Sequence, residues 1–523
     1  MESKYKKILT IFLALAMVST AVVFSGCVED EGEEQTLVVG TTDRATTLDP
    51  ADSYDYFSSN ILFNTVEQLI SYEPGTSDVT EGLAEDWEIE DELTYRFHLR
   101  EGVTFHDGTE MTSSDVEFSL ERARDLGGDP GFLLENIDDV ETVDEYEFII
   151  HLERPESTFL TKLGYTVGSI VSEEAYEEDD FSATEVVGTG PYELESWDQG
   201  EQIRLTAFED YWGDQPYAKE VVVQIYEDSS QLHNAIDAEE VDVGYREFTP
   251  QQRNDLEEDE TIQTKEVGSP YIRYIVNQVQ EGEASDERVR QAFAYALDRE
   301  DIDESIYEGT VEPLHSMVPN DMWGHKSSFE ERYGEGQDLE EARALLEDAG
   351  YSEEDPLEMD LHYTPSHYGP LEDKLAQKVQ EQFEDTDMIE VSLESAEWTR
   401  YTEDMVNGDM GVFLLGWYPD YFDPDGYISP FLTPSGGRSL GSYYNNTEMT
   451  EMIEDQQAIV DQDERTPILE DIQDLLAEEA PYIPLYQGTS FAAYGEDVDG
   501  DSVILGPLQI FRYYTIKKEG WER

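Results

Sequence analysis

The sequence predicts an α/β protein of two or three domains, and two observations support this fold class. Residues 357–415 alternate between short apolar runs and amphipathic runs. Such alternation is typical of a parallel sheet whose strands are joined by right-handed helical crossovers. The second observation is length, because roughly 490 residues beyond position 27 exceed what one hydrophobic core organises. The expected elements are strands at residues 357–363, 389–393 and 410–415 and helices at residues 371–383 and 398–406.

Local patterns predict the remaining elements in chain order. An apolar run at residues 36–42 predicts a first buried strand, and spaced apolar positions at residues 61–70 predict a helix. Apolar and basic residues alternate at residues 95–99, which predicts one strand of a hairpin. Residues 112–115 carry a capping-box pattern that opens a further helix. Towards the C-terminus we expect acidic helices at residues 447–460 and 464–479 and a strand at residues 482–486.

Residues 1–26 are predicted to be a signal peptide, because lysines precede an uncharged apolar run at residues 8–24. The Phe-Ser-Gly-Cys sequence that follows resembles a lipobox, with phenylalanine where leucine is usual. We therefore expect Cys27 to be the lipid-attachment site and new N-terminus, so that the chain is lipid-anchored at the outer face of the cell membrane. Residues 27–35 form an acidic tether. Cys27 is the only cysteine, which excludes disulfides within the chain and thiolate metal centres.

The composition is strongly acidic. The chain has 31 Lys and Arg against 123 Asp and Glu, a formal net charge of −92. Acid spread along every segment is typical of a halophilic protein, because concentrated salt screens the self-repulsion. The chain also has 38% hydrophobic and 11% aromatic residues, enough to build cores. Nucleic acids and anionic membrane surfaces are poor partners for such a polyanion.

An ordered series of motifs gives a family resemblance. The series begins with Leu-Asp-Pro, Leu-Ala-Glu-Asp-Trp-Glu and Tyr-Arg-Phe-His-Leu-Arg-Glu-Gly-Val-Thr-Phe-His-Asp-Gly, and continues along the chain. Together these blocks resemble the large solute-binding lipoproteins of ABC importers, family 5, which take peptides, nickel complexes and related solutes. The blocks lie at residues 48–50, 83–88, 95–108, 112–116, 188–192, 211–213, 289–299 and 344–351.

The resemblance implies a fold and a role. It implies the type II, cluster C periplasmic-binding-protein-like fold, in which two α/β lobes close on a ligand and a third domain is added. It also implies an extracytoplasmic receptor that is not an enzyme, has no cofactor, is a monomer, and delivers its ligand to a membrane permease and its ATPase. By this resemblance lobe I takes residues 36–60, 186–265 and 483–523, domain II takes residues 61–185, and lobe III takes residues 266–482.

The loop after the last predicted strand is the candidate ligand site. Trp417, Tyr418 and Tyr421 place rings beside the carboxylates of Asp420 and Asp423. Because open α/β sheets hold ligands at strand ends, these rings could sandwich a peptide-like ligand while a carboxylate binds its amine. The alternative is that Trp417 and Tyr421 are core residues and the acids are solvated loop charges. The resemblance implies that Asp420 pairs with the α-ammonium of a peptide.

Two further side chains join this site by resemblance or position. Trp398 precedes Trp417 by nineteen residues, the spacing of a second tryptophan in oligopeptide-binding relatives. His362 and His367 flank residues 363–366 at the end of a predicted strand, and both could face the cleft as metal ligands, although a third ligand is not evident. We therefore predict no built metal site.

The other end of the ligand has no obvious partner. Dipeptide-binding relatives hold the peptide carboxylate with an arginine at a position that Ser366 takes here, and no arginine lies between Arg343 and Arg400. Longer peptides or a cationic solute are therefore the expected ligands, with a nickel-chelate receptor as the close alternative. Substitutes for the missing arginine are Arg273, Arg400 and Arg438.

Other functional classes find less support. The chain has no His-Glu-x-x-His motif and no Gly-x-Ser-x-Gly elbow, so a secreted hydrolase is a distant alternative and no catalytic residues are assigned. His106 and the Gly188-Thr189-Gly190 sequence are interpreted as structural turns. A surface scaffold or sensor without transport is also compatible with the sequence.

Overall fold

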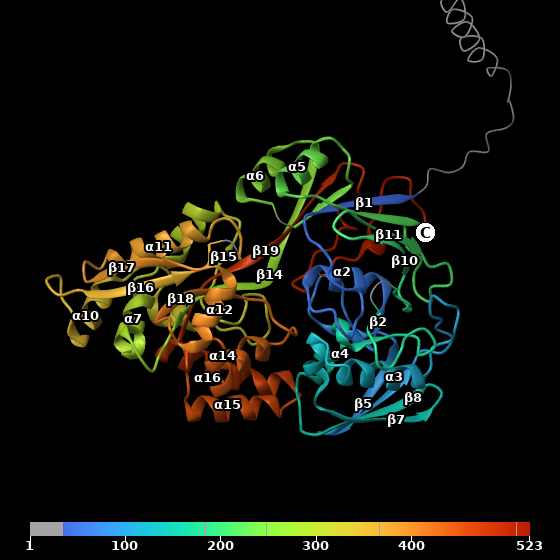
Figure 1. The fold of residues 1–523 in the computed structure, drawn as a ribbon, viewed down its shortest axis with the longest axis horizontal. Helices are drawn as coiled ribbons and strands as arrows, with labels where there is room; N and C mark the ends of the chain where they lie inside the picture. The colour runs from blue at the N-terminus through green and yellow to red at the C-terminus, as the bar shows by residue number, and fades with distance from the viewer. Residues whose placement is uncertain (1–34, 183–184, 247, 366, 509) are drawn as a thin grey trace, which may run out of the picture. The chain divides into compact units, whose positions relative to one another are not determined.

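One large mixed sheet runs through the molecule, in the strand order β10-β11-β12-β1-β13-β19-β14-β18-β16-β17 (Figure 1). The structure is a computed structural model that describes residues 35–182, 185–246, 248–365, 367–508 and 510–523. The predicted signal peptide and Cys27 lie outside these residues. Thr36–Arg523 form one compact unit. No helix in the described ranges is long and apolar enough to span a bilayer.

The first half of the sheet is built around the N-terminal strand. β1 (Thr36–Thr41) pairs in parallel with β12 (Glu220–Ile225) and with β13 (Val243–Tyr245). Leu37 and Val39 are fully buried, which confirms the predicted first strand. The strands β10 (Tyr192–Asp198) and β11 (Gln202–Ala207) extend the sheet, and α5 (Ser229–Asp237) and α6 (Pro250–Glu258) pack beside it.

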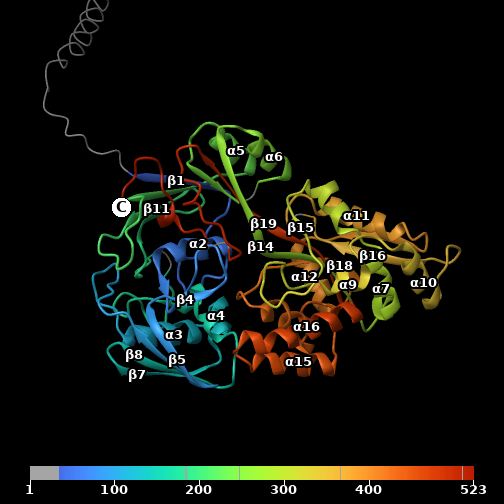
Figure 2. The same cartoon turned by 180° about the vertical axis from the view of Figure 1, so that it is seen from behind.

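Two long antiparallel strands join the two halves of the sheet. β14 (Ile262–Asn277) and β19 (Tyr482–Gly495) run between the halves in both views (Figures 1 and 2). Their pairing shifts register between Gly268 and Ile272, so the three residues between them bulge out of the ladder. The predicted strand at residues 482–486 is thus the start of a much longer strand.

The second half contains the predicted strand–helix alternation. β16 pairs in parallel with both β17 and β18, which confirms the expected parallel sheet with helical crossovers. The elements are β16 (Leu357–Tyr363), α11 (Glu372–Glu384), β17 (Ile389–Ser395), α12 (Trp398–Asn407) and β18 (Val412–Trp417). Helices around this sheet are α7 (Glu287–Tyr295), α8 (Arg299–Ile302), α9 (Ser328–Tyr333), α10 (Leu339–Ala349), α13 (Ser429–Leu432), α14 (Pro434–Ser439), α15 (Thr447–Gln457) and α16 (Gln462–Glu479).

A separate four-stranded antiparallel sheet has the order β5-β6-β8-β7. The predicted hairpin strand is β6 (Thr94–Leu99), and the predicted capping box at Thr112 and Asp115 opens α3. The elements are β5 (Ala84–Asp91), β7 (Ile137–Asp144), β8 (Glu147–Leu152), α3 (Ser113–Asp125) and α4 (Phe159–Leu163). Short strands nearby are β2 (Glu67–Gln68), β3 (Ile70–Tyr72), β4 (Val79–Glu81) and β9 (Ser169–Ile170); β15 (Glu312–Pro313) pairs with β19.

One predicted helix was misplaced. Residues 61–70 were expected to be helical, but α2 spans Tyr56–Thr65. The helix begins earlier because the Asp55 carboxylate caps it, accepting a hydrogen bond from the Ser58 amide at 2.8 Å. It ends before Glu67 because residues 67–72 pair as β2 and β3. Apolar spacing alone therefore missed a capping signal.

Buried apolar side chains of the described residues fall into three large clusters. One lies around β1, α2 and the last residues of the chain, one inside the four-stranded sheet and α3, and one around β14, β16 and β18. A smaller cluster joins α5 and α6 to β19. The exact domain boundaries stay a prediction.

Candidate functional site

The loop that leaves β18 is braced by Trp417. Its indole nitrogen donates a hydrogen bond to the carbonyl of Gly426 at 2.9 Å, and its ring packs edge-on against Phe431 at 5.2 Å. Trp417 is half-buried and pairs with Ile272 across the sheet. It lines neither cavity described below, so its contacts hold the turn that carries the neighbouring side chains.

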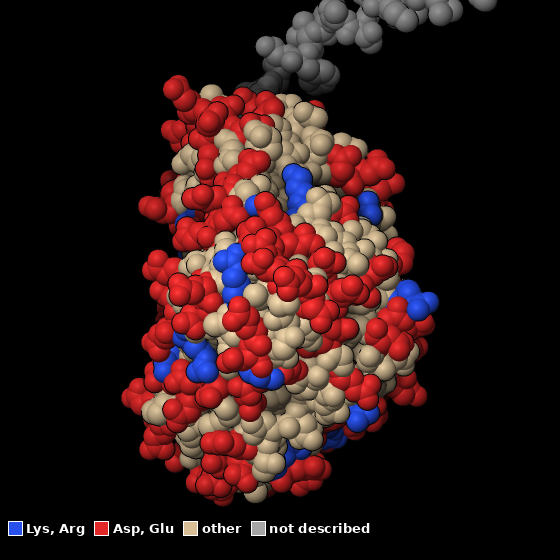
Figure 3. All heavy atoms as spheres, turned by 90° about the vertical axis from the view of Figure 1, so that its left-hand side faces the viewer, with Lys and Arg blue, Asp and Glu red and all other residues tan. Residues whose placement is uncertain are grey.

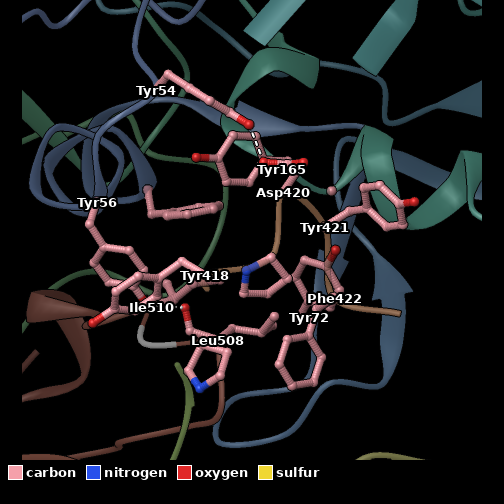
Figure 4. A pocket seen from close by; sticks show the side chains of 14 residues that line it. Tyr54, Tyr56, Tyr72, Tyr165, Tyr418, Asp420, Tyr421, Phe422, Leu508 and Ile510 are labelled. Carbon is pink, nitrogen blue, oxygen red and sulfur yellow. Dashed lines mark hydrogen bonds between the residues drawn. The ribbon is translucent and has the colours of Figure 1, made fainter. Parts of the chain in front are cut away.

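A first cavity of about 180 Å³ lies beside this loop. Eight of its fourteen lining residues are aromatic, and Figure 4 shows Tyr418 lying against Tyr56 and the Asp420 carboxylate pointing to Tyr54 (Figure 4). The ring centroids of Tyr56 and Tyr418 are 5.5 Å apart. The lining residues are Tyr54, Tyr56, Phe63, Tyr72, Gly164, Tyr165, Pro270, Tyr418, Pro419, Asp420, Tyr421, Phe422, Leu508 and Ile510.

Asp420 is the carboxylate of this cavity. It is half-buried and accepts a hydrogen bond from the Tyr54 hydroxyl, which comes from a segment 366 positions away. Burial raises the pKa of Asp420 above its usual 3.8, while the Tyr54 hydrogen bond and the Lys162 ammonium pull that pKa down. The site thus holds a partly desolvated carboxylate among rings, an arrangement suited to binding an ammonium group.

Tyr421 lines one side of the same cavity, and Lys162 contacts its ring. The Lys162 ammonium lies 4.8 Å from the centre of the Tyr421 ring and also pairs with Glu156. The Tyr421 hydroxyl donates to Asp425 at 2.6 Å. These contacts fix the ring of Tyr421, so it serves as a rigid wall.

Asp423 forms a buried ion pair with Arg465. It is 3% exposed, and both of its oxygens accept hydrogen bonds from Arg465 at 2.7 and 3.0 Å. Asp423 also accepts from the amide of Asp425 at 2.9 Å. Its carboxylate lies outside both cavities, so Asp423 is the deeper acid and Asp420 the one that faces the cavity.

A second and larger cavity of about 660 Å³ shares Tyr418 with the first. His367 lines it and stacks on Trp398, with ring centroids 3.6 Å apart and an interplanar angle of 4°. Trp398 does not line either cavity, so it supports His367 from behind. Other lining residues include Arg246, Phe248, Arg253, Tyr271, Tyr307, Tyr368, Glu372, Tyr486, Gly488 and Thr489.

The structure therefore brings together only part of the predicted site. Tyr418, Asp420 and Tyr421 line the first cavity, and Tyr418 and His367 line the second. The predictions missed Tyr54, Tyr56, Tyr72 and Tyr165, which come from distant segments. The sequence carried no local signal for them, because 32 tyrosines are spread along the chain.

The histidines do not gather into a metal site. Within the ranges that the structure describes, no three His, Cys, Asp or Glu side chains lie close enough to hold a metal ion. His362 is half-buried on β16 and is absent from the linings of both cavities. Burial and the nearby Arg273 lower the pKa of His367 below 6.5.

The two motifs interpreted as turns contact each other. The Nδ1 atom of His106 accepts a hydrogen bond from the Gly188 amide at 3.3 Å, and the Nε2 atom lies 3.0 Å from the Gly190 carbonyl. Burial lowers the pKa of His106, so the ring is neutral and can accept at one nitrogen and donate at the other. Both motifs thus have a structural role away from the cavities.

Known proteins are similar to this chain in sequence and fold. Residues 78–439 match the family model described as bacterial extracellular solute-binding proteins, family 5, middle. The dipeptide-binding protein of Escherichia coli K12 is 27% identical over 493 residues, covering 88% of this chain and 90% of that protein.

Solved structures agree. The binding protein DppA from Helicobacter pylori in complex with the peptide STSA is 25% identical, covers 92% of this chain and 98% of that one, and has a TM-score of 0.76. NikA from Staphylococcus aureus in complex with Ni(L-His)2 has a TM-score of 0.72 at 19% identity, covering 92% of this chain and 100% of that one. The α/β fold is therefore the two-lobed fold of these binding proteins. With a family model matched over most of its length, the chain belongs to the bacterial extracellular solute-binding proteins of family 5.

Proposed function

We propose that this protein is the receptor of an ABC importer and captures peptides by their free amino terminus. The observation that supports this most directly is Asp420, a half-buried carboxylate at the edge of an aromatic cavity. A peptide's α-ammonium offers three donors and a full charge, so it would replace or join the neutral Tyr54 hydroxyl as the partner of Asp420. The names of the relatives, a dipeptide-binding protein and a peptide complex, point the same way.

The first cavity is lined by residues from distant parts of the chain, which supports closure of the two lobes on a ligand. Tyr54 and Tyr56 come from the N-terminal half of the chain, whereas Tyr418 and Asp420 come from the loop after β18. A ligand that contacts both groups stabilises the closed arrangement relative to an open one, which is a hinge motion around the bound solute. No bond is made or broken in this role, and ATP hydrolysis belongs to another subunit of the importer.

The test is the variant Asp420→Asn, which keeps the shape of the side chain and removes its charge. We expect it to weaken binding of free-amine peptides at least about tenfold and to leave N-acetylated peptides nearly unchanged. Co-purified and added peptides are measured by native mass spectrometry and titration calorimetry. Asp404→Asn, at an acid outside both cavities, is the matched control. Equal losses for both peptide classes would refute the amine-anchor role.

A second candidate function is the binding of a metal chelate. His367 is exposed at the wall of the larger cavity, and its lowered pKa leaves the imidazole neutral and able to bind a metal. Since the described residues offer no three-ligand cluster, such a ligand would bring its own donors, as in the NikA complex. Titration with nickel and free histidine tests this, and His367→Ala should abolish any binding observed.

We further propose how the receptor is anchored to the membrane and how its chain is divided into domains. Cys27 carries lipid and anchors a monomer at the outer face of the membrane, and the acid-rich surface suits a hypersaline medium. The three large apolar clusters support a division into lobe I, domain II and lobe III at about the predicted boundaries. Cys27→Ser should release the protein from membranes, whereas retention would mean that residues 8–24 stay as a membrane span.

A further inference from the structure

One asparagine of the chain lies in a motif that the proposed function does not use. The sequence Asn445-Asn446-Thr447 matches the Asn-x-Ser/Thr acceptor pattern of N-linked glycosylation, a modification of chains that leave the cytoplasm. The chain has ten asparagines, and only Asn445 is followed two positions later by serine or threonine. The sequence therefore offers one acceptor site, which the structure can test for accessibility.

Asn445 is exposed on a short loop whose two sides are anchored in the core. The loop joins α14 to α15, and Asn445 itself lies outside both helices. Tyr444 before it is 4% exposed, and Met449 after it is fully buried. Of the other nine asparagines only Asn234 and Asn407 are exposed, and both lie in helices. Asn445 is thus the one exposed asparagine of the described residues that lies in irregular backbone.

The structure gives the two adjacent asparagines different roles. The Asn446 side chain caps α15, because its Oδ1 atom accepts hydrogen bonds from the amides of Glu448 at 2.8 Å and Met449 at 3.3 Å. Its Nδ2 atom donates to the Glu479 carboxylate at 2.8 Å. The Asn445 side chain makes no hydrogen bond to the part of the chain that the structure describes. The Asn445 amide nitrogen is therefore the accessible one of the pair.

The third residue of the motif is accessible as well. Thr447 is exposed at the first position of α15, and its hydroxyl has no hydrogen-bond partner among the described residues. Asn446 has an extended backbone, with φ −126° and ψ 127°. An extended residue places the side chains before and after it on the same side of the chain. The Asn445 amide and the Thr447 hydroxyl are therefore presented together to an approaching enzyme.

We infer that Asn445 carries an N-linked glycan, transferred from an oligosaccharide that is joined to a lipid phosphate. The Asn445 amide nitrogen forms a bond to the anomeric carbon of the sugar, and the bond from that carbon to the phosphate oxygen breaks. The departing lipid phosphate keeps the electron pair of the broken bond, and one amide proton is released. The inference goes beyond the proposed function and rests only on its location outside the cytoplasm.

A glycan at this position leaves ligand binding unobstructed. Asn445 and Thr447 are absent from the linings of both cavities. A glycan is bulky and hydrophilic, so it requires a surface position such as this loop. Loss of the glycan should therefore leave peptide affinity unchanged, which separates this site from the ligand site.

The experiment uses the full-length chain, produced in its own host cell, recovered and digested with trypsin. The peptide of residues 439–465 contains the whole motif and has no internal lysine or arginine. Mass spectrometry with electron-transfer fragmentation finds any added sugar and assigns it to one residue. The variants Asn445→Gln and Thr447→Ala remove the motif, whereas Thr447→Ser keeps it. Asn407→Gln is the matched control, because Asn407 is an exposed asparagine outside any such motif.

The expected result is a sugar mass on Asn445 in the wild type, in Thr447→Ser and in Asn407→Gln. The same peptide should be unmodified in Asn445→Gln and in Thr447→Ala. An unmodified wild-type peptide from a chain that begins at lipid-modified Cys27 would overturn the inference and leave the receptor proposal intact. A chain recovered from the cytoplasm with residues 1–26 still attached would overturn the proposed location and this inference with it.

Discussion

At Asp420, burial and hydrogen bonding act in opposite directions on one carboxyl group. Burial raises its pKa, while the Tyr54 hydroxyl and Lys162 favour the charged form. The net effect is that the pKa of Asp420 lies above the ordinary aspartate value of 3.8, so a bound cation would stabilise the charged form of this carboxyl group. A bound ammonium favours the charged form, so ligand affinity and protonation of Asp420 are linked.

The first prediction concerns this linkage. Ammonium binding requires ionised Asp420, so affinity for free-amine peptides should fall as the pH drops through the raised pKa, beginning above pH 3.8. Tyr54→Phe removes a hydrogen bond that lowers this pKa and should move the midpoint to higher pH. Affinity is measured by calorimetry against pH while circular dichroism monitors the fold. A pH-dependence that survives in Asp420→Asn would contradict the assignment.

The second prediction concerns Asp423 and Arg465, whose side chains are 5% and 1% exposed. Arg465→Met leaves a buried carboxylate without its partner, which should cost about 3–5 kcal/mol of unfolding free energy. The measurement is equilibrium denaturation. Arg400→Met, which breaks an exposed pair with Asp404, is the control and should hardly move the midpoint. A similarly small effect at Arg465 would mean that water reaches this pair.

At the scale of elements, glycines allow two backbone segments to pack closely, and the periodicity of apolar residues does not reveal these contacts. The Gly188-Thr189-Gly190 turn packs on the end of α2, with the Gly190 amide donating to the Thr65 carbonyl at 3.2 Å. The Thr189 hydroxyl donates to Glu67 at 2.9 Å. These hydrogen bonds hold the C-terminal end of α2 in place. Because Tyr56 is the first residue of α2 and lines the first cavity, the turn helps to position that part of the cavity wall.

The third prediction tests that fastening. In Gly190→Ala a Cβ atom would lie 2.5 Å from the Thr65 carbonyl carbon, a backbone atom that cannot turn aside. We expect a loss of about 1–3 kcal/mol in denaturant unfolding. Gly411→Ala is the control, since its nearest neighbour is the flexible Glu283 carboxylate at 3.1 Å. Equal stability of the two variants would show that the turn moves away from Thr65 to accommodate the added Cβ atom.

At the scale of the whole molecule, charge dominates the surface. Figure 3 shows one face covered largely by Asp and Glu, with scattered Lys and Arg (Figure 3). A net charge of −92 spread in this way opposes the compact state through self-repulsion. The first cavity differs from this surface, because eight of its fourteen lining residues are aromatic and Asp420 is the one acid among them.

The fourth prediction follows from screening. Raising KCl from about 0.1 to about 1 M shortens the Debye length from about 10 to about 3 Å, so the thermal unfolding midpoint at pH 7 should rise markedly. Differential scanning calorimetry measures it. Near the sequence isoelectric point of about 4.1 the net repulsion vanishes, and the salt effect should shrink wherever the fold persists. A salt response independent of pH would point to ion binding instead of screening.

The sequence by itself determined the features that depend on neighbours along the chain. The alternation at residues 357–415 and the capping box of α3 predicted elements that the structure confirms, and the ordered motifs predicted the family that the family model confirms. The same local pattern placed Asp420 on a strand-end loop. The start of α2 was missed because one capping carboxylate, Asp55, outweighed the apolar spacing.

Tertiary structure alone decided which of these side chains meet. Tyr54 reaches Asp420 across 366 positions, and Arg465 engages Asp423 across 42. Periodicity and spacing report on residues a few positions apart, whereas these contacts depend on how the sheet brings distant segments together. For that reason Asp420 and Asp423, two acids of one loop that look equivalent in the sequence, have separate places: Asp420 faces the cavity and Asp423 pairs with Arg465 inside the fold.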